Sequence, residues 1–228
     1  MRIVFVRHGH PNYADDCLTE LGHEHAEAAS LRLLNEGISE IHASSCGRAV
    51  ETAQHTAQKL GLPVTQHDFI REIRWGAKDG SEIPHRGHPW LMALDMAQNG
   101  QKLMDPNWKT AEPFCRNDKL IEAVEAVEAG FDGWMQELGY TREGDYYRVT
   151  GENTDRTVAM FSHAGSSTAA LAHLFNLPFP YMCETLAPNF TAVTVITLAD
   201  DPGTLTAPRF EIANDARHIE HMPITISN

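Results

Sequence analysis

The sequence predicts an α/β fold, a three-layer α/β/α arrangement with a mostly parallel central sheet and an inserted lid. Short apolar runs typical of buried strands alternate with longer segments of helical periodicity, which is the order of elements in a parallel α/β sheet. With 228 residues, 42% of them hydrophobic and 21% charged, the chain has the length and composition of one globular domain. We therefore expect residues 1–228 to form a single domain.

The first predicted strand is Ile3–Val6, a continuous apolar run typical of a strand that is covered on both faces. Arg7 and His8 follow at the carboxyl end of this strand. Thr19 is a good N-cap, so we predict a helix over residues 20–36. The residues expected on the inward side of this helix are Leu21, Ala28, Leu31 and Leu34.

A second strand-and-helix unit follows. Ile41–Ser44 is a short apolar strand, and Arg48–Leu60 is a helix that ends at Gly61. Val64–Phe69 is the next predicted strand. Arg48 therefore lies at the start of a helix, where the backbone N–H groups favour an anion.

The regular alternation stops after residue 69. Residues 81–114, rich in proline and tryptophan, read as an insertion with one helix over Leu91–Gln98. Long connections of this kind are usually functional or disordered, so we interpret the insertion as a lid that sets substrate choice.

A long amphipathic helix is predicted next, capped by Asn117 or Asp118 and extending to Leu138. The polar span Thr141–Asp155 is typical of a turn-rich connection.

The last predicted elements return the chain to the sheet. The strand Thr157–Ser162 ends at His163 and is followed by a helix over Ser166–Phe175. Thr191–Leu198 is a β-branched strand, and Arg209–Ala213 is an edge strand. In a parallel α/β sheet ligands bind at the carboxyl ends of the strands, which is where both His8 and His163 are placed.

Charge and cysteine content exclude several classes of function. The formal net charge of -13 argues against a nucleic-acid partner or an anionic membrane surface, because basic patches attract both. The N-terminus has no signal-peptide pattern, and no apolar run is long enough for a membrane span. We expect a cytoplasmic protein with reduced, dispersed thiols at Cys17, Cys46, Cys115 and Cys183.

Arg7 and His8 are unusual at the end of a buried strand, because unpaired buried charge costs several kcal/mol. A bound phosphoryl group would compensate this buried charge. The structural alternative is that Arg7 pairs with a buried carboxylate while His8 is a satisfied core histidine.

Five sequence blocks carry a family resemblance. They are R-H-G at residues 7–9, L-T-E-L-G at 18–22, S-C-G-R-A-V-E-T-A at 45–53, R-E-I-R-W-G at 71–76 and S-H-A-G at 162–165. In this order they resemble the histidine phosphatase superfamily, on its phosphoglycerate mutase-like branch. The resemblance covers residues 1–175 apart from the insertion.

The resemblance implies that His8 is the nucleophile, which attacks phosphorus and becomes a transient phosphohistidine. A neutral imidazole is a competent nucleophile near pH 7, which agrees with this role. Glu72 would donate a proton to the leaving oxygen, with Asp79 as a weaker candidate. A surface carboxylate paired with a neighbouring arginine is the structural alternative for Glu72.

Substrate binding and catalysis would both depend on Arg7, Arg48 and His163, which the resemblance places around the phosphoryl oxygens. Guanidinium groups match this charge distribution with paired N–H donors. Asn12 is a further candidate for contact with the phosphate. The scheme requires neither a metal nor an organic cofactor.

The chain also departs from the family. Pro11 and Tyr13 stand in the region where mutase-like members carry Ser or Thr and then Trp-Asn. We therefore expect a hydrolase that acts on a phosphomonoester of a small molecule. A phosphoglycerate mutase-type phosphotransferase and a non-catalytic module that binds phosphate or a phosphoprotein are the alternatives.

The insertion offers two ways to bind the rest of a substrate. A second anionic group could meet one of its basic side chains, and a base or sugar could stack on Trp90 or Trp108. A lid with solvated charges is the plainer alternative. The basic candidates are His85, Arg86, His88, Lys102 and Lys109.

The 13 histidines raise the possibility of a metal protein, but the close pairs supply only two ligands each, whereas a metal centre usually needs three or four. We therefore expect no metal site. A homodimer, formed through the sheet edge or the C-terminal helices, is possible.

Overall fold

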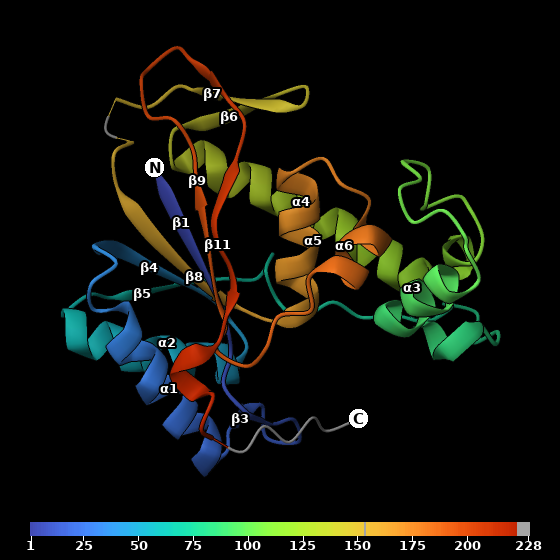
Figure 1. Ribbon diagram of the computed structural model, residues 1–228, viewed down its shortest axis with the longest axis horizontal. Helices are drawn as coiled ribbons and strands as arrows, with labels where there is room; N and C mark the ends of the chain where they lie inside the picture. Colours follow the sequence, from blue (N-terminus) through green and yellow to red (C-terminus); the bar gives the residue numbers. More distant parts are fainter. Residues whose placement is uncertain (153, 223–228) are drawn as a thin grey trace.

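A six-stranded sheet forms the centre of the computed structural model, which describes residues 1–152 and 154–222 (Figure 1). The strand order is β11-β9-β1-β8-β4-β5, and the pairs β1–β8, β8–β4 and β4–β5 are parallel, while β9 is antiparallel to both of its neighbours. The predicted mostly parallel sheet is confirmed. Its strands are β1 (Arg2–Arg7), β4 (Ile38–Ser44), β5 (Val64–His67), β8 (Thr157–Ser162), β9 (Val193–Thr197) and β11 (Arg209–Asp215).

Helices cover both faces of this sheet, which confirms the three-layer arrangement. Val4 and Val6 point into an apolar cluster shared with α1 and α2, whereas Ile3 and Phe5 point into a larger cluster shared with α4, α5 and α6. Because all four side chains are almost fully buried, the strand reads as a continuous apolar run. The helices are α1 (Glu20–Leu33), α2 (Gly47–Leu60), α4 (Asp118–Glu137), α5 (Ala164–Leu174) and α6 (Phe179–Thr185).

Helix α1 confirms its predicted cap and corrects its predicted face. The Thr19 hydroxyl accepts a hydrogen bond from the Gly22 N–H over 3.0 Å. Leu31 and Leu34, expected inside, are 54% and 41% exposed. The buried stripe of α1 follows the i, i+3, i+4, i+7 pattern but is shifted by one position from the predicted face. Small side chains on this stripe allow α1 to pack closely on α2. Its members are Ala26, Ala29, Ser30 and Leu33.

The predicted insertion packs against the main body of the protein (Figure 1). It contains η1 (Pro84–Gly87) and α3 (Pro89–Gln98), and η2 (Phe114–Arg116) begins at its last residue. Five of its buried apolar side chains belong to the same cluster as those of α4, α5 and α6. A lid movement of this insertion stays a prediction. The buried side chains are Met92, Ala93, Met96, Trp108 and Phe114.

The span predicted as a turn-rich connection contains a hairpin, so that interpretation was wrong for this part. Strands β6 (Tyr140–Glu143) and β7 (Tyr146–Val149) form a small antiparallel sheet with β10 (Leu205–Thr206). Polar residues in these strands obscure the alternating hydrophobic pattern by which a strand is predicted. The Tyr147 ring is nevertheless fully buried, and its hydroxyl donates to Asp132 over 2.8 Å. A short ribbon of β2 (Pro11–Asn12) and β3 (Cys17–Leu18) follows β1.

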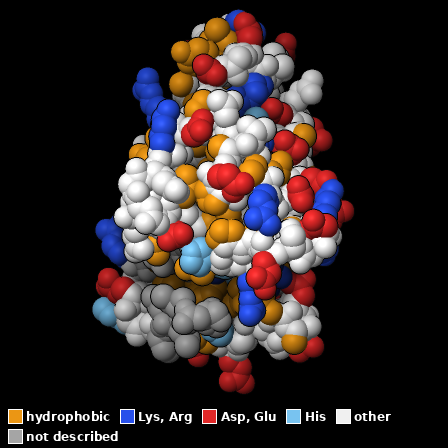
Figure 2. Space-filling model, turned by 90° about the vertical axis from the view of Figure 1, so that its right-hand side faces the viewer, with side chains coloured by type: hydrophobic (Ala, Val, Ile, Leu, Met, Phe, Trp, Pro, Cys, Tyr) orange, Lys and Arg blue, Asp and Glu red, His pale blue; other side chains and the backbone are white. Residues whose placement is uncertain are grey.

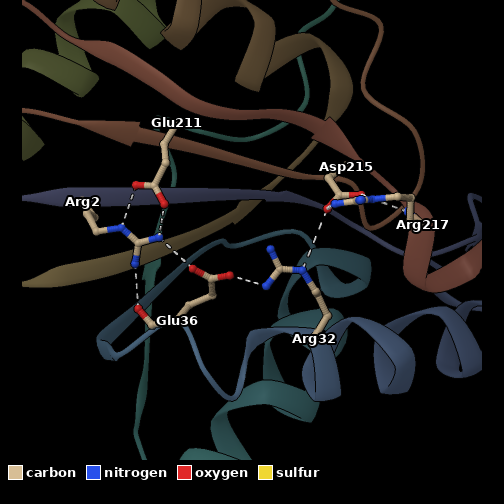
Figure 3. A network of polar contacts seen from close by, with 6 residues as sticks. All are labelled: Arg2, Arg32, Glu36, Glu211, Asp215 and Arg217. Atoms are coloured by element: carbon tan, nitrogen blue, oxygen red, sulfur yellow. Dashed lines mark hydrogen bonds and ion pairs between the residues drawn. The ribbon is translucent and has the colours of Figure 1, made fainter.

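A polar network ties β1 to the end of α1 and to β11 (Figure 3). The Arg2 guanidinium donates to Glu36 over 2.7 Å and to Glu211 over 2.8 Å. Arg32 bonds the other oxygen of Glu36 and lies 3.9 Å from Asp215. Among the described residues, no helix is both long and apolar enough to cross a membrane.

Candidate active site

The parallel pairing of β1 and β8 places the two predicted histidines side by side. Arg7 lies opposite Ser162 in the register, so His8 and His163 leave the sheet at the same edge. The His8 N–H donates to the Ser162 carbonyl over 2.9 Å, and the two imidazole centroids are 5.2 Å apart. Two segments far apart in the sequence thus form one site.

The environment of His8 selects its tautomer. Its Nδ1 lies 2.7 Å from the Gly9 carbonyl oxygen, which can only accept a hydrogen bond. Nδ1 therefore carries the proton, and Nε2 keeps a free lone pair. Burial, followed by the nearby Arg7 guanidinium, holds the pKa of His8 well below its usual value. The ring is neutral near pH 7, as a nucleophile must be.

Arg7 is partly buried beside this ring and keeps unused donors. Its Nη1 donates to the Pro188 carbonyl over 2.8 Å, and the guanidinium lies 4.2 Å from the centroid of the Phe190 ring. Its Nε is buried and has no hydrogen-bond partner. An unpartnered guanidinium N–H at a strand end is well suited to an anionic ligand.

Arg48, at the start of α2, lies beside a carboxylate that the sequence analysis did not identify. One oxygen of Asp16 accepts from Arg48 Nη1, and the other accepts from the Gly47 N–H over 2.9 Å. Asp16 reaches this position through a left-handed backbone conformation with a φ of 52°. The Arg48 Nε is buried and unpartnered, like that of Arg7. The Asp16 carboxylate thus accepts hydrogen bonds from some of the donors that could bind an anion.

Glu72 is fixed at the N-terminus of α5. Its Oε1 accepts hydrogen bonds from the backbone N–H groups of Ile73 over 3.0 Å, Gly165 over 3.0 Å and Ser166 over 3.2 Å. Burial nevertheless raises the pKa of this carboxyl, because it outweighs the opposing effects of Arg7 and of the backbone donors. A carboxyl group with a raised pKa beside a phosphoryl site has the properties of a general acid.

His163 completes the cluster. Its Nε2 lies 2.8 Å from the hydroxyl of Ser44, the last residue of β4, and its Nδ1 is buried without a partner. Burial and the neighbouring His8 hold the pKa of His163 well below its usual value. Ser44 directly precedes the 45–53 sequence block, but only the strand geometry reveals its contact with His163.

The other two candidates lie outside this cluster of contacts. The Asn12 side chain stabilises its own turn, where its amide donates to Asp15 over 2.9 Å and its oxygen accepts from Ala14 N–H over 3.1 Å. Its contact with phosphate stays a prediction. Asp79 is exposed and accepts from the Ser81 N–H over 2.9 Å, which lowers its pKa. Glu72 is therefore the better placed acid.

A cavity of about 300 Å³ opens above Arg7 and Glu72. Of the insertion residues considered as substrate contacts, His88 and Trp90 line it. The remaining lining residues are Tyr13, Trp75, Ala164, Ala187 and Pro188. Two larger cavities, of about 530 and 540 Å³, lie beside this one and at η1, but neither contains both Arg7 and Glu72.

The other insertion candidates are engaged elsewhere or lie apart from this cavity. His85 and Arg86 line the cavity at η1, and Lys109 donates to Glu128 over 2.8 Å. Trp108 packs on Phe114 and Phe179 in the core. Lys102 is exposed and does not line the cavity above Arg7.

In the described part of the chain, no third metal-ligating side chain joins the close histidine pairs. Across residues 1–152 and 154–222, no group of three or more His, Cys, Asp or Glu side chains is arranged to hold a metal ion.

Comparisons with known proteins concern the family and the fold of the chain. The family model described as "Histidine phosphatase superfamily (branch 1)" matches residues 3–209. A probable phosphoglycerate mutase, GpmB, of Yersinia pestis (strain Pestoides F) is 29% identical over 92 residues, which are 36% of this chain and 43% of that protein. The alignment thus spans less than half of the curated relative.

Solved structures share the fold over nearly the whole chain. A mycobacterial glucosyl-3-phosphoglycerate phosphatase is 22% identical with a TM-score of 0.61, and 93% of this chain and 98% of that chain are covered. A phosphoserine phosphatase mutant from Entamoeba histolytica is 15% identical with a TM-score of 0.64, covering 96% and 98%. Bacillus stearothermophilus YhfR is 19% identical with a TM-score of 0.62, covering 96% and 99%. At these identities the likeness concerns the fold alone.

Proposed function

Since the chain belongs to the histidine phosphatase superfamily, we propose that it is a metal-independent phosphatase that hydrolyses a phosphomonoester of a small molecule through a phosphohistidine on His8. The observation that carries the proposal is the Nδ1 contact of His8 with the Gly9 carbonyl, which leaves Nε2 as the nucleophilic nitrogen. The unpartnered Nε groups of Arg7 and Arg48 support it, because they offer donors for the phosphoryl oxygens.

The proposed first step transfers the phosphoryl group to the protein. His8 Nε2 attacks phosphorus while the bond from phosphorus to the ester oxygen breaks, and Glu72 donates its proton to that oxygen. Arg7, Arg48 and His163 surround the three phosphoryl oxygens, where charge is concentrated in the transition state. The alcohol product then leaves.

The second step releases inorganic phosphate. Glu72, now a carboxylate, accepts a proton from a water molecule that attacks the phosphohistidine, and the bond from phosphorus to Nε2 breaks. His8 is then neutral again and Glu72 is protonated, so the cycle is closed. A mutase would share the first step but return the phosphoryl group to a hydroxyl of the sugar acid instead of water.

Phosphate release from a generic aryl phosphate in the presence of EDTA tests the proposal. We expect turnover by the native protein, no turnover by His8→Ala, and a rate about 10²–10⁴-fold lower for Glu72→Gln. His221→Ala is the matched control, because its imidazole is 92% exposed and it should keep the native rate.

Rapid quenching distinguishes the alternatives. The native protein should carry an acid-labile, base-stable phosphate on His8 that is absent in His8→Ala. Labelling of His8 with exchange between phosphoglycerate isomers and no phosphate release would favour a mutase. Binding of phosphate without labelling or turnover would identify a binding module and contradict the proposal.

A further inference from the structure

Aromatic rings make up much of the lining of the cavity at Arg7 and Glu72. The rings of Trp75 and His88 meet edge to face with centroids 5.1 Å apart, and His88 and Trp90 lie 5.7 Å apart. All three line the cavity, together with the ring of Tyr13. These contacts form a row of flat surfaces beside the place where the phosphoryl group is expected to bind.

Charge is scarce on this wall. Among the described residues that line the cavity, Arg7 is the one Lys or Arg, and its donors are needed at the phosphoryl group. Burial lowers the pKa of His88, so its ring is neutral near pH 7. The cavity therefore lacks a cation for a second anionic group of the substrate.

Further basic side chains line a separate cavity of about 530 Å³, which shares Glu72 with this one. Two of the four Lys and Arg side chains that line it are engaged with other residues. Lys78 bonds Glu122, and Arg71 donates to Ser45 over 2.9 Å and lies 3.7 Å from Asp68. This second cavity is the place where a substrate with two anionic ends would have to extend.

His88 adds a polar contact to the aromatic wall. Its Nδ1 is buried and has no hydrogen-bond partner, although the ring lies between two tryptophans. A buried polar atom of this kind is costly unless a ligand satisfies it. A flat ring with a polar edge would both stack on the wall and bond this nitrogen.

We infer that the substrate is a phosphomonoester whose alcohol carries an aromatic ring, which stacks between Trp75, Trp90 and Tyr13 while its phosphoryl group meets His8. The inference rests on the proposed phosphatase function and names its substrate class. A volume of about 300 Å³ is at the lower end of small-molecule sites, so one ring system with a short spacer fills it.

The charge distribution on the exposed face around the insertion agrees with a substrate whose alcohol is small and neutral rather than polyanionic. Figure 2 shows Lys and Arg side chains interspersed with Asp and Glu on this face, and hydrophobic side chains running across its middle. A mixed surface of this kind does not concentrate anionic ligands.

A matched substrate pair tests the inference. Adenosine 5′-monophosphate and ribose 5-phosphate have the same type of leaving oxygen and differ in the aromatic base. We expect kcat/KM to be about 10- to 100-fold higher for the nucleotide, which is the range expected from stacking of one base.

Variants then locate the contact. Trp75→Ala and Trp90→Ala should lower kcat/KM for the nucleotide more than for ribose 5-phosphate, so that the ratio of the two values falls toward 1. Trp75→Phe and Trp90→Phe should restore part of the preference. Tyr146→Ala is the control, because this aromatic side chain is 50% exposed on β7 and should alter neither rate.

The outcomes separate the two proposals. Equal rates with both substrates, or a faster reaction with 3-phosphoglycerate than with either, would overturn the aromatic inference and leave the phosphatase intact. If no phosphomonoester is hydrolysed, the proposed function fails, and binding to His8→Ala measured by calorimetry still decides the inference. Tighter binding of the nucleotide than of ribose 5-phosphate would then support it, and equal binding would contradict it.

Discussion

The pKa values of His8 and Glu72 are shifted in opposite directions by the same cause, which is burial. Burial lowers the pKa of His8 and raises that of Glu72, because it disfavours the charged form of each. The proposed first step needs neutral His8 and protonated Glu72. Activity is therefore lost at low pH when His8 takes up a proton, and at high pH when Glu72 loses one.

We expect the acid limb of kcat/KM well below pH 6.5, the ordinary value for histidine, and a basic limb above pH 4.5, the ordinary value for glutamate. Glu72→Gln should remove the basic limb as well as lower the rate. Glu143→Gln, on the surface hairpin, should leave the profile unchanged. A basic limb that persists in Glu72→Gln would show that another group donates the proton.

Asp16 accepts hydrogen bonds from Arg48 and from the Gly47 N–H, so in the proposed mechanism it would compete with the substrate for these donors. Asp16→Asn keeps an oxygen for that N–H but removes the negative charge beside the phosphoryl position. We expect inorganic phosphate to inhibit this variant about 5- to 10-fold more strongly, because one charge repulsion of about 1 kcal/mol is removed. Unchanged or weaker inhibition would mean that Asp16 chiefly positions Arg48.

Sequence blocks were sufficient to predict residues that the structure brings together at one edge of the sheet, but not the residues that contact them. His8, His163 and Arg48 lie in short motifs whose order is itself informative. The contacts of Asp16 and Ser44 depend on a left-handed backbone residue and on strand pairing, and neither has a local sequence pattern.

At the scale of elements, the N-termini of α2 and α5 each hold a carboxylate of the chain. Gly47 N–H binds Asp16, while Gly165 and Ser166 N–H groups bind Glu72. Both helices therefore direct their N-terminal N–H groups toward the candidate site.

Glycine is required at the start of α5 because the chain is crowded there. A Cβ at Gly165 would lie 2.3 Å from Ile73 and 2.6 Å from the Glu72 carboxylate. We expect Gly165→Ala to displace Glu72 and to lower kcat about 10²-fold or more, a loss of the kind seen when a catalytic proton donor is removed.

Gly133→Ala in α4 is the matched control. A Cβ there meets nothing within 4 Å, so activity should be native and the free energy of unfolding should rise by about 0.5–1 kcal/mol. Native activity of Gly165→Ala would contradict the assigned position of Glu72. Thermal unfolding separates a local effect from a loss of folding.

Elements with strong hydrophobic periodicity were predicted well, and those with mixed faces were not. The α4 helix carries its large apolar side chains on one stripe, whereas α1 buries small residues and exposes Leu31 and Leu34. In the β6–β7 hairpin, tertiary contacts rather than local pattern fix the strands.

At the scale of the whole molecule, buried neutral histidines make stability depend on pH. His8, His25 and His163 have pKa values below 6.5 in the folded protein, about 4 for His25, whereas the unfolded chain has ordinary values. Below pH 6.5 the unfolded state binds more protons, so stability falls as the pH falls toward the folded values. Glu72 has the opposite sign, and its contribution is lost as the pH rises through its raised pKa.

We expect the midpoint temperature of thermal unfolding to decrease as the pH is lowered from 7 to 5. His25→Gln should reduce this fall, because both ring nitrogens of His25 are buried without partners and cannot be protonated without cost. His221→Gln, at an exposed position, should not change it. An unaltered pH dependence in His25→Gln would show that His25 does not contribute.

The position of β1 between β8 and β9 also determines when the site forms. In the register Arg7 pairs with Ser162 and Val6 with Val193, so neither edge of β1 is covered by neighbouring sequence. During synthesis on the ribosome, β1 is made before both of its partners, β8 and β9, and its two edges stay open until these strands follow. Catalytic competence is thus acquired late in folding, and recovery of activity after denaturation should coincide with closure of the sheet around β1.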